Sequence, residues 1–252
     1  MIKAAVFDLD HTLFDRYATL KQIVFTTEPE LLPFRTDTPR EEVAEKWIYA
    51  DKNFIHLGWD RVRQFFNENN MLRDEARDKD IFREYAMPCF KKVAVPYEFT
   101  LPTLNKLKQM GLKLGLITNG PSDLQRAKLK LLGLENIFDE VIISGEAGYH
   151  KPDIEIFNIA AARLGLAPGE MFYIGDNPLN DVETSRRAGY VPVWVRTTGT
   201  WVMPEIEKPV LQVDTVQELL YNSFLPPQNA DGHRQVLHCI LPGQHFARPG
   251  FS

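Results

Sequence analysis

The sequence predicts an α/β protein with a parallel sheet as its core and a helical segment inserted after the first strand. Three observations lead to this prediction. A strand is expected at residues 3–8, because residues 4–7 are an apolar run. Residues 15–95 show helical spacing alone, and residues 99–195 alternate helical patterns with short apolar runs. Strands that alternate with helices are typical of βαβ units and a parallel sheet. We therefore expect residues 3–8 to join the same sheet as the later strands.

Composition and charge narrow the classes of partner. The 252-residue chain is 44% hydrophobic and 25% charged, as is usual for a globular protein. Its net charge of −5 lacks the basic balance of proteins that bind nucleic acid polymers, and no apolar run approaches the roughly 18 residues of a membrane span. Cys89 and Cys239 have no paired spacing, and the first residues show no signal-peptide pattern. We expect a cytoplasmic monomer or small homo-oligomer without nucleic acid or membrane partners.

The first strand ends in two acids. The apolar run of residues 4–7 is followed by Asp8 and Asp10. Side chains at i and i+2 point to the same side of an extended chain, so these carboxylates are expected to converge. Close carboxylates repel each other unless a cation or a shared proton relieves them, and Mg²⁺ is commonly held by one or two carboxylates. An acidic strand end that only caps a turn is the alternative for this pair alone.

The segment after the first strand is predicted to form a small helical cap over residues 15–95, between core segments 1–14 and 96–225. Its apolar positions recur at helical spacing: Val43, Trp47, Ala50 and Phe54, then Val62, Phe65 and Phe66, then Ile81, Phe82 and Tyr85. We expect Trp47, Phe54 and Phe65 to be core residues. Trp59 follows Gly58 in an expected inter-helix loop and is the better candidate for a ring that faces a ligand.

The following elements are marked by glycines. Strands are expected at residues 112–117, 141–144, 171–175 and 191–195, with helices between them that end before Gly111, Gly133, Gly165 and Gly189. Glycine is typical directly after a helix because it adopts the left-handed conformation cheaply.

The last segment, residues 226–252, shows neither helical nor strand periodicity. It contains His233, His238, His245 and Cys239, in a spacing that matches no familiar zinc pattern. We expect a loosely ordered C-terminal tail.

Polar residues follow several of the predicted strands. Thr118-Asn119-Gly120 follows the second strand, Lys151 precedes a helix, and Asp176 and Asp181 follow the strand at residues 171–175. Each is ordinary by itself, as a turn, a surface lysine or a helix cap. Because the carboxyl ends of parallel strands meet at one edge of a sheet, together they predict a site that binds a divalent cation and a phosphoryl group.

These motifs, in this order, resemble those of the haloacid dehalogenase superfamily: D-x-D-x-T from Asp8 to Thr12, the Thr118 motif, Lys151, and G-D-x4-D from Gly175 to Asp181. The resemblance covers residues 1–225, and residues 15–95 resemble the superfamily's type-one cap. It implies a Rossmann-like core, dependence on Mg²⁺ and an aspartyl-phosphate intermediate. Dehalogenases of the superfamily lack an acid two residues after the nucleophile, so Asp10 favours phosphoryl transfer.

The resemblance also implies roles for individual residues. Asp8 would attack phosphorus, and Asp10, with a raised pKa, would protonate the leaving group and then deprotonate water. Mg²⁺ would be held by Asp8, the backbone carbonyl of Asp10 and Asp176. Thr118, the amide of Asn119 and Lys151 would bind the phosphoryl group, and Asp181 would orient Lys151 or a metal-bound water.

The predicted function is therefore Mg²⁺-dependent hydrolysis of a small phosphorylated metabolite, of the nucleotide or sugar-phosphate type. A phosphomutase of the same superfamily is the first alternative. A non-catalytic binding protein that kept the fold is the second.

Overall fold

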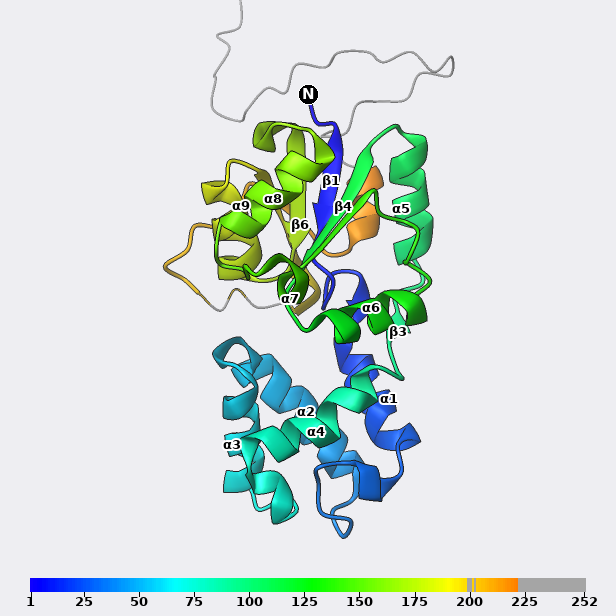
Figure 1. The fold of residues 1–252 in the computed structure, drawn as a ribbon, viewed down its shortest axis with the longest axis vertical. Coiled ribbons are helices and arrows are strands. Elements are labelled where there is room, and N and C mark those ends of the chain that lie inside the picture. The colour runs from blue at the N-terminus through cyan, green and yellow to red at the C-terminus, as the bar shows by residue number, and fades with distance from the viewer. Residues whose placement is uncertain (199–200, 202, 222–252) are drawn as a thin grey trace, which may run out of the picture.

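The computed structural model describes residues 1–198, 201 and 203–221 (Figure 1). The predicted tail at residues 226–252, with its histidines and Cys239, lies outside the described residues. Within them, the chain forms an α/β core in the upper part of Figure 1 and a group of helices in the lower part.

The core is a six-stranded parallel sheet in the order β5-β4-β1-β6-β7-β8. Its strands are β1 (Ala4–Phe7), β4 (Lys113–Thr118), β5 (Glu140–Ile143), β6 (Met171–Gly175), β7 (Val191–Val195) and β8 (Leu211–Val213). The prediction of a Rossmann-like parallel core is confirmed. The edge strand β8 was not predicted, because three residues are too few to display a period.

Helices cover both faces of the sheet. They are α5 (Thr100–Gln109), α6 (Ser122–Leu131), α7 (Ser144–Ala147), α8 (Glu155–Leu164) and α9 (Thr184–Arg187), with shorter turns η4 (Pro168–Glu170), η5 (Pro178–Glu183), η6 (Arg196–Thr198) and η7 (Val216–Leu220). The four glycines expected after helices all have left-handed φ angles, which confirms these predicted ends: Gly111 (80°), Gly133 (68°), Gly165 (65°) and Gly189 (84°).

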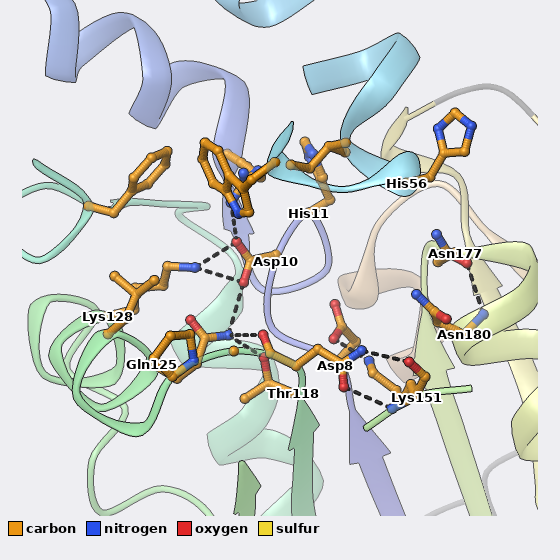
Figure 2. A pocket seen from close by; sticks show the side chains of 18 of the residues that line it. Asp8, Asp10, His11, His56, Thr118, Gln125, Lys128, Lys151, Asn177 and Asn180 are labelled. Atoms are coloured by element: carbon orange, nitrogen blue, oxygen red, sulfur yellow. Dashed lines mark hydrogen bonds and ion pairs between the residues drawn. The ribbon is translucent and has the colours of Figure 1, made fainter. Parts of the chain in front are cut away.

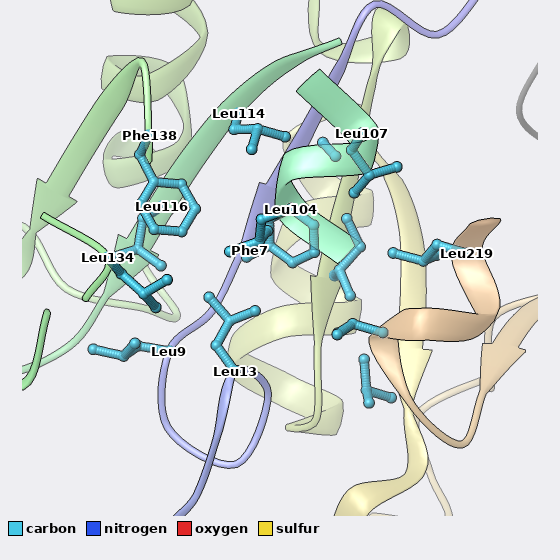
Figure 3. Packing of buried hydrophobic residues seen from close by; sticks show 14 of the residues in the cluster. Phe7, Leu9, Leu13, Leu104, Leu107, Leu114, Leu116, Leu134, Phe138 and Leu219 are labelled. Carbon is cyan, nitrogen blue, oxygen red and sulfur yellow. The ribbon is translucent and has the colours of Figure 1, made fainter. Parts of the chain in front are cut away.

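Strand β1 is central because all four of its residues are apolar and buried. Alternate residues face opposite sides of a strand. Ala5 and Phe7 join the cluster that contains Leu104 of α5 and Leu219 of η7 (Figure 3), whereas Ala4 and Val6 join the cluster beneath α8. Since both faces are covered, the first polar residues after β1 emerge at the carboxyl edge of the sheet.

The inserted segment consists of α1 (Arg16–Thr26), α2 (Arg40–Phe54), α3 (Trp59–Glu68) and α4 (Lys79–Phe90), with short turns η1 (Pro29–Leu31), η2 (Ile55–Leu57) and η3 (Glu75–Arg77). These helices share a hydrophobic cluster around Trp47, which is fully buried as predicted, and Leu124 of α6 in the core also joins this cluster. Phe54 and Phe65 are partly buried against the same cluster.

A two-stranded antiparallel ribbon connects the two parts. It consists of β2 (Phe14–Asp15) and β3 (Val95–Pro96), with Phe14 opposite Pro96 and Asp15 opposite Val95. The ribbon therefore lies at the two boundaries that the sequence predicted for the cap. None of the helices that the structure describes is both long and apolar enough to cross a membrane.

Candidate active site

The predicted site residues line one cavity of about 470 Å³ at the carboxyl ends of β1, β4 and β6, facing the helical segment (Figure 2). From the core, the lining includes every residue that the sequence singled out for chemistry: Asp8, Asp10, Thr118, Asn119, Lys151, Asp176 and Asp181. The parallel topology brings them together because the loops that follow these strands share one edge of the sheet.

Lys151 is the centre of the buried polar contacts at the sheet edge. Its Nζ donates to Asp8 Oδ1 at 2.6 Å, to Asp181 Oδ1 at 2.7 Å and to the hydroxyl of Tyr173 at 3.0 Å. An ammonium group has three hydrogens, so these contacts use all of them. Burial acts to lower the pKa of Lys151, but Asp181 and Asp8 raise it well above its usual value. Lys151 is therefore a fixed positive charge beside Asp8.

The turn η5 positions Asp181 under Lys151. The side chain of Asn177 caps this turn by accepting from the backbone N–H groups of Leu179 and Asn180, and the Asn177 N–H donates to Asp181 Oδ2 at 2.9 Å. Gly175, the last residue of β6, lies against this carboxylate so closely that a Cβ at residue 175 would overlap it. The glycine of the G-D-x4-D motif thus makes room for the second acid.

Three carboxylates gather at this end of the cavity and form a candidate metal site. Oxygen atoms of Asp8, Asp176 and Asp181 lie within 4.8 Å of one another. Burial, and then the charges of Asp181 and Asp8, raise the pKa of Asp176 well above its usual value. Carboxylate oxygens are the ligands that Mg²⁺ prefers, and a divalent cation would relieve this repulsion. The donor set therefore fits Mg²⁺.

Asp8 shows the same crowding. Burial and the neighbouring Asp181 raise its pKa to about 7, against the lowering effect of Lys151. Its Oδ1 accepts from Lys151, whereas no donor among the described residues contacts Oδ2. One oxygen is thus anchored, and the other is available to a metal or to an electrophile.

Asp10 differs from expectation in two respects. Strand β1 ends at Phe7, so Asp8 and Asp10 follow the strand instead of lying within it. The Asp10 carboxylate is directed to Lys128 (2.8 and 2.9 Å) and to Arg16 Nη1 (2.7 Å), away from the group of three acids. The two carboxylates line the same cavity, but Asp10 is not one of the three acids that gather at the candidate metal site.

The expected rise in the pKa of Asp10 is wrong for this structure. Burial does act to raise it, but the charges of Lys128 and Arg16 outweigh burial and hold the pKa well below its usual range. The carboxylate is therefore ionised while these two contacts persist.

Thr118 at the end of β4 is held by a residue that the sequence analysis did not identify. The side-chain amide of Gln125 donates to the Thr118 hydroxyl oxygen, and also to Asp10 Oδ2 at 3.2 Å. Because the threonine oxygen accepts this hydrogen bond, its own hydrogen remains free to point into the cavity.

Asn119 is used mainly to place Lys151. Its side-chain amide donates to the Lys151 carbonyl and accepts from the Lys151 N–H, both at 2.9 Å. Both polar atoms of the side chain are occupied in this way. The predicted contact between Asn119 and a phosphoryl oxygen would therefore fall to its backbone N–H.

A buried ionic network extends from Asp10 into the cap. Arg16 begins α1 and donates to both oxygens of Asp51 on α2, at 2.8 to 3.0 Å, while its Nη1 reaches Asp10. His11 Nε2 lies 3.2 Å from the same Asp51 carboxylate. These contacts join the core loop to the helical segment.

The sequence analysis missed Arg16, Asp51, Gln125 and Lys128. One signal was available for Lys128. It lies at i+4 from Leu124 and at i−4 from Leu132, so a lysine interrupts the apolar stripe of α6. Asp51 lies far from the motifs in sequence. Arg16 lies close behind the D-x-D-x-T motif, but it belongs to no motif and offered no comparable pattern.

Two aromatic side chains of the inserted segment, Trp59 and Tyr17, line different cavities. Trp59 lines the main cavity, where the Arg16 guanidinium lies 5.6 Å from the centre of its ring. Tyr17 lines a smaller neighbouring cavity of about 120 Å³ with Asp176 and His56. The geometry therefore favours Trp59 as a ring that contacts a ligand.

The chain is similar to known proteins over most of its length. A family model described as haloacid dehalogenase-like hydrolase matches residues 5–195. A glyceraldehyde 3-phosphate phosphatase of Methanopyrus kandleri is 32% identical over 233 residues, which are 87% of this chain and 99% of that protein. A phosphoserine phosphatase of Thermus thermophilus is 48% identical over 92 residues, covering 36% of this chain and 37% of that protein.

A solved structure is also similar. The crystal structure of a HAD phosphatase from Thermococcus onnurineus has a TM-score of 0.57 and 28% sequence identity, over 87% of this chain and 97% of that one. The similarity extends well beyond the sheet, because the core alone does not account for this coverage.

Proposed function

We propose that this chain hydrolyses small phosphate monoesters in a Mg²⁺-dependent reaction that passes through an aspartyl-phosphate. The chain belongs to the haloacid dehalogenase-like hydrolases and is a phosphomonoesterase. The observation that carries the proposal is the placement of Asp8. One of its oxygens is fixed by Lys151 at 2.6 Å, beside two further carboxylates. A nucleophile, a fixed cation and a divalent-cation site within one cavity are what attack on an anionic phosphate requires.

In the first step, Asp8 forms a bond to phosphorus while the bond from phosphorus to the ester oxygen breaks. Lys151 and the Thr118 hydroxyl stabilise the charge on the non-bridging oxygens, and Asp181 keeps Lys151 in position. Mg²⁺, held by Asp8, the Asp10 carbonyl and Asp176, would offset the repulsion between carboxylate and phosphate.

Asp10 is proposed to give its proton to the departing alkoxide and to recover one from the attacking water. Water then displaces Asp8 from phosphorus and releases inorganic phosphate. Because Lys128 and Arg16 hold Asp10 ionised, this role requires the bound substrate to loosen at least one of these contacts, so that Asp10 takes up a proton from solvent before the ester oxygen departs.

The relatives suggest the size of the substrate. The names of the glyceraldehyde 3-phosphate phosphatase and the phosphoserine phosphatase point to three-carbon phosphate esters, and a cavity of about 470 Å³ is ample for such molecules. We propose a small phosphorylated metabolite as the substrate, in a cytoplasmic setting, with the helices of residues 16–90 acting as a cap over it.

The test is phosphate release from a panel of phosphate esters with MgCl₂, with EDTA, and with the Asp8→Asn variant. Hydrolysis should need the cation and should fall at least about 10³-fold in Asp8→Asn, because an amide cannot form the intermediate. Circular dichroism of the variant checks that the fold persists. The covalent mechanism would be abandoned if a folded Asp8→Asn protein retained substantial turnover.

A further inference from the structure

The charges around the cavity are segregated. Asp8, Asp176 and Asp181 gather with a single lysine at one end. The part of the lining next to Asp10 instead carries Arg16 and Lys128, and Figure 2 shows Lys128 approaching Asp10 from the side away from Lys151. The acidic end suits a metal and a phosphoryl group. In the proposed reaction Asp10 protonates the leaving group, so the cationic part lies on the side of the leaving group.

Lys128 has an unusual environment for a lysine. It is only 3% exposed, and its Nζ lies 5.5 Å from the ring centre of Phe14 and 6.0 Å from that of Phe90. Burial of an ammonium group is unfavourable without a partner. Its anionic partner is Asp10, which Arg16 already contacts at 2.7 Å.

One carboxylate is thus shared by two buried cations. Arg16 also has a partner of its own in Asp51, so neutralisation of Asp10 does not require Lys128. The cap adds another positive charge, since Arg83 of α4 lines the cavity and pairs with no carboxylate among the described residues. In the resting contacts, Asp51 and Asp10 balance Arg16 and Lys128. When Asp10 carries the proton that the proposed reaction requires, Asp51 alone balances these two buried cations, and the cationic part of the lining then has capacity for one more anion.

We propose that Lys128, together with Arg16, binds a carboxylate on the leaving group of the substrate, and so selects phosphate esters of hydroxy acids. The inference rests on the proposed phosphatase reaction, because the position of Asp10 beside the leaving oxygen sets the distances. Both Asp10 oxygens lie within 2.9 Å of Lys128 Nζ. A leaving oxygen hydrogen-bonded to Asp10 would then lie less than about 6 Å from this ammonium group. A carboxylate two or three carbons along the leaving group spans that gap.

Two matched pairs of esters test the inference, each pair exchanging a carboxylate for a neutral CH₂OH. The pairs are phosphoglycolate with 2-hydroxyethyl phosphate, and 3-phosphoglycerate with glycerol 3-phosphate. We expect kcat/KM to favour the carboxylate in at least one pair by about tenfold or more, as a charge-assisted contact provides. Lys128→Met should remove the preference, and Lys128→Arg should retain most of it. Lys130→Met is the matched control, because Lys130 is exposed on the same helix.

A binding measurement separates selection from catalysis, since Lys128 also contacts Asp10. With MgCl₂ present, calorimetry compares 3-phosphonopropionate, which cannot be hydrolysed, with 3-hydroxypropylphosphonate. The carboxylate compound should bind about tenfold more tightly than the hydroxyl compound to wild type and to Lys130→Met. The two compounds should bind equally tightly to Lys128→Met.

The outcomes distinguish the two hypotheses. Ester hydrolysis without any carboxylate preference, or a preference that survives in Lys128→Met, would overturn the carboxylate site and leave the phosphatase proposal standing. Tight, Lys128-dependent binding of 3-phosphonopropionate without hydrolysis of any ester would support the site while the proposed reaction fails.

Discussion

At the scale of single residues, the pKa values of Asp8 and Asp10 shift in opposite directions, although both residues line the same cavity and only Leu9 separates them. Asp8 shares Lys151 with Asp181, so burial and a neighbouring acid prevail and the pKa rises to about 7. Burial acts on Asp10 too, but two cations contact it and its pKa falls. The balance between desolvation and ion pairing therefore differs within one short loop.

The raised pKa of Asp8 predicts a pH dependence of stability. The ordinary value is 3.8 and the folded value about 7, so between these the folded protein holds a proton that the unfolded chain has lost. Stability should fall as pH rises through this window. Asp8→Asn removes this effect. In EDTA, the free energy of unfolding of Asp8→Asn minus that of wild type should increase by more than about 1 kcal/mol from pH 5 to pH 8.

Urea denaturation of both proteins at the two pH values is the measurement. Saturating MgCl₂ should abolish this increase in the stability difference, because the cation stabilises ionised Asp8. An equal difference between the proteins at pH 5 and pH 8 would contradict the raised pKa.

Asp176 is expected to act through the metal. Asp176→Ala removes one of three crowded carboxylates, so the Mg²⁺ concentration for half-maximal activity should rise at least about tenfold. Titration of activity with MgCl₂, supported by calorimetry of Mg²⁺ alone, is the check. Asp37→Ala, which removes an exposed acid in the cap, should leave the curve unchanged. A curve for Asp176→Ala identical to that of wild type would exclude Asp176 as a ligand.

At the scale of elements, the junction between β6 and η5 determines where the second acid lies. The η5 turn brings the chain back over the strand end, and only a residue without Cβ leaves room for Asp181 beside residue 175. Asp181 in turn accepts from Lys151 on a different loop. One glycine thus connects a local backbone feature with the position of the cation beside the nucleophile.

Gly175→Ala should therefore displace Asp181 and lose both stability and activity. Overpacking of this kind costs about 1–3 kcal/mol, measured by thermal denaturation, and kcat should fall as Lys151 shifts. Gly169→Ala is the matched control, since the nearest atom to its added Cβ is 3.9 Å away. If Gly175→Ala were as stable and as active as the control variant, the tight packing would not matter for the site.

At the scale of the whole molecule, the cavity belongs to two parts that have separate hydrophobic clusters. They are connected by the ribbon of β2 and β3, and by the contacts of Arg16 with Asp10 of the core and Asp51 of the cap. In the proposed reaction the core motifs contact only the phosphoryl group and the leaving oxygen. Recognition of the rest of a substrate must then involve the cap and the Lys128 region.

Trp59→Ala should consequently change the ranking of substrates more than the stability of the core. Trp59 lines the cavity, so kcat/KM for the preferred ester should fall roughly tenfold relative to that for a small generic ester. Phe54→Ala is the control, because Phe54 packs in the same cap cluster and is not part of the lining. A similar change of ranking in both variants would indicate a general loosening of the cap.

The sequence by itself determined the fold class and most of the residues of the candidate site. Apolar runs and glycines at helix ends depend on local chemistry, so they identified five of the six strands of the core. The motif residues follow directly after strands, and parallel topology obliges such residues to meet at one edge. This is why Asp8, Lys151, Asp176 and Asp181 could be associated without coordinates.

Only the tertiary structure decided which carboxylates share a cation. Asp10 was expected to converge with Asp8, and both line the same cavity, but Lys128 and Arg16 draw the Asp10 carboxylate away from the three acids of the candidate metal site. Those partners come from α6 and from the cap, at positions that carry no motif. Ion pairing and desolvation depend on distances across the fold, which a pattern in one chain segment does not contain.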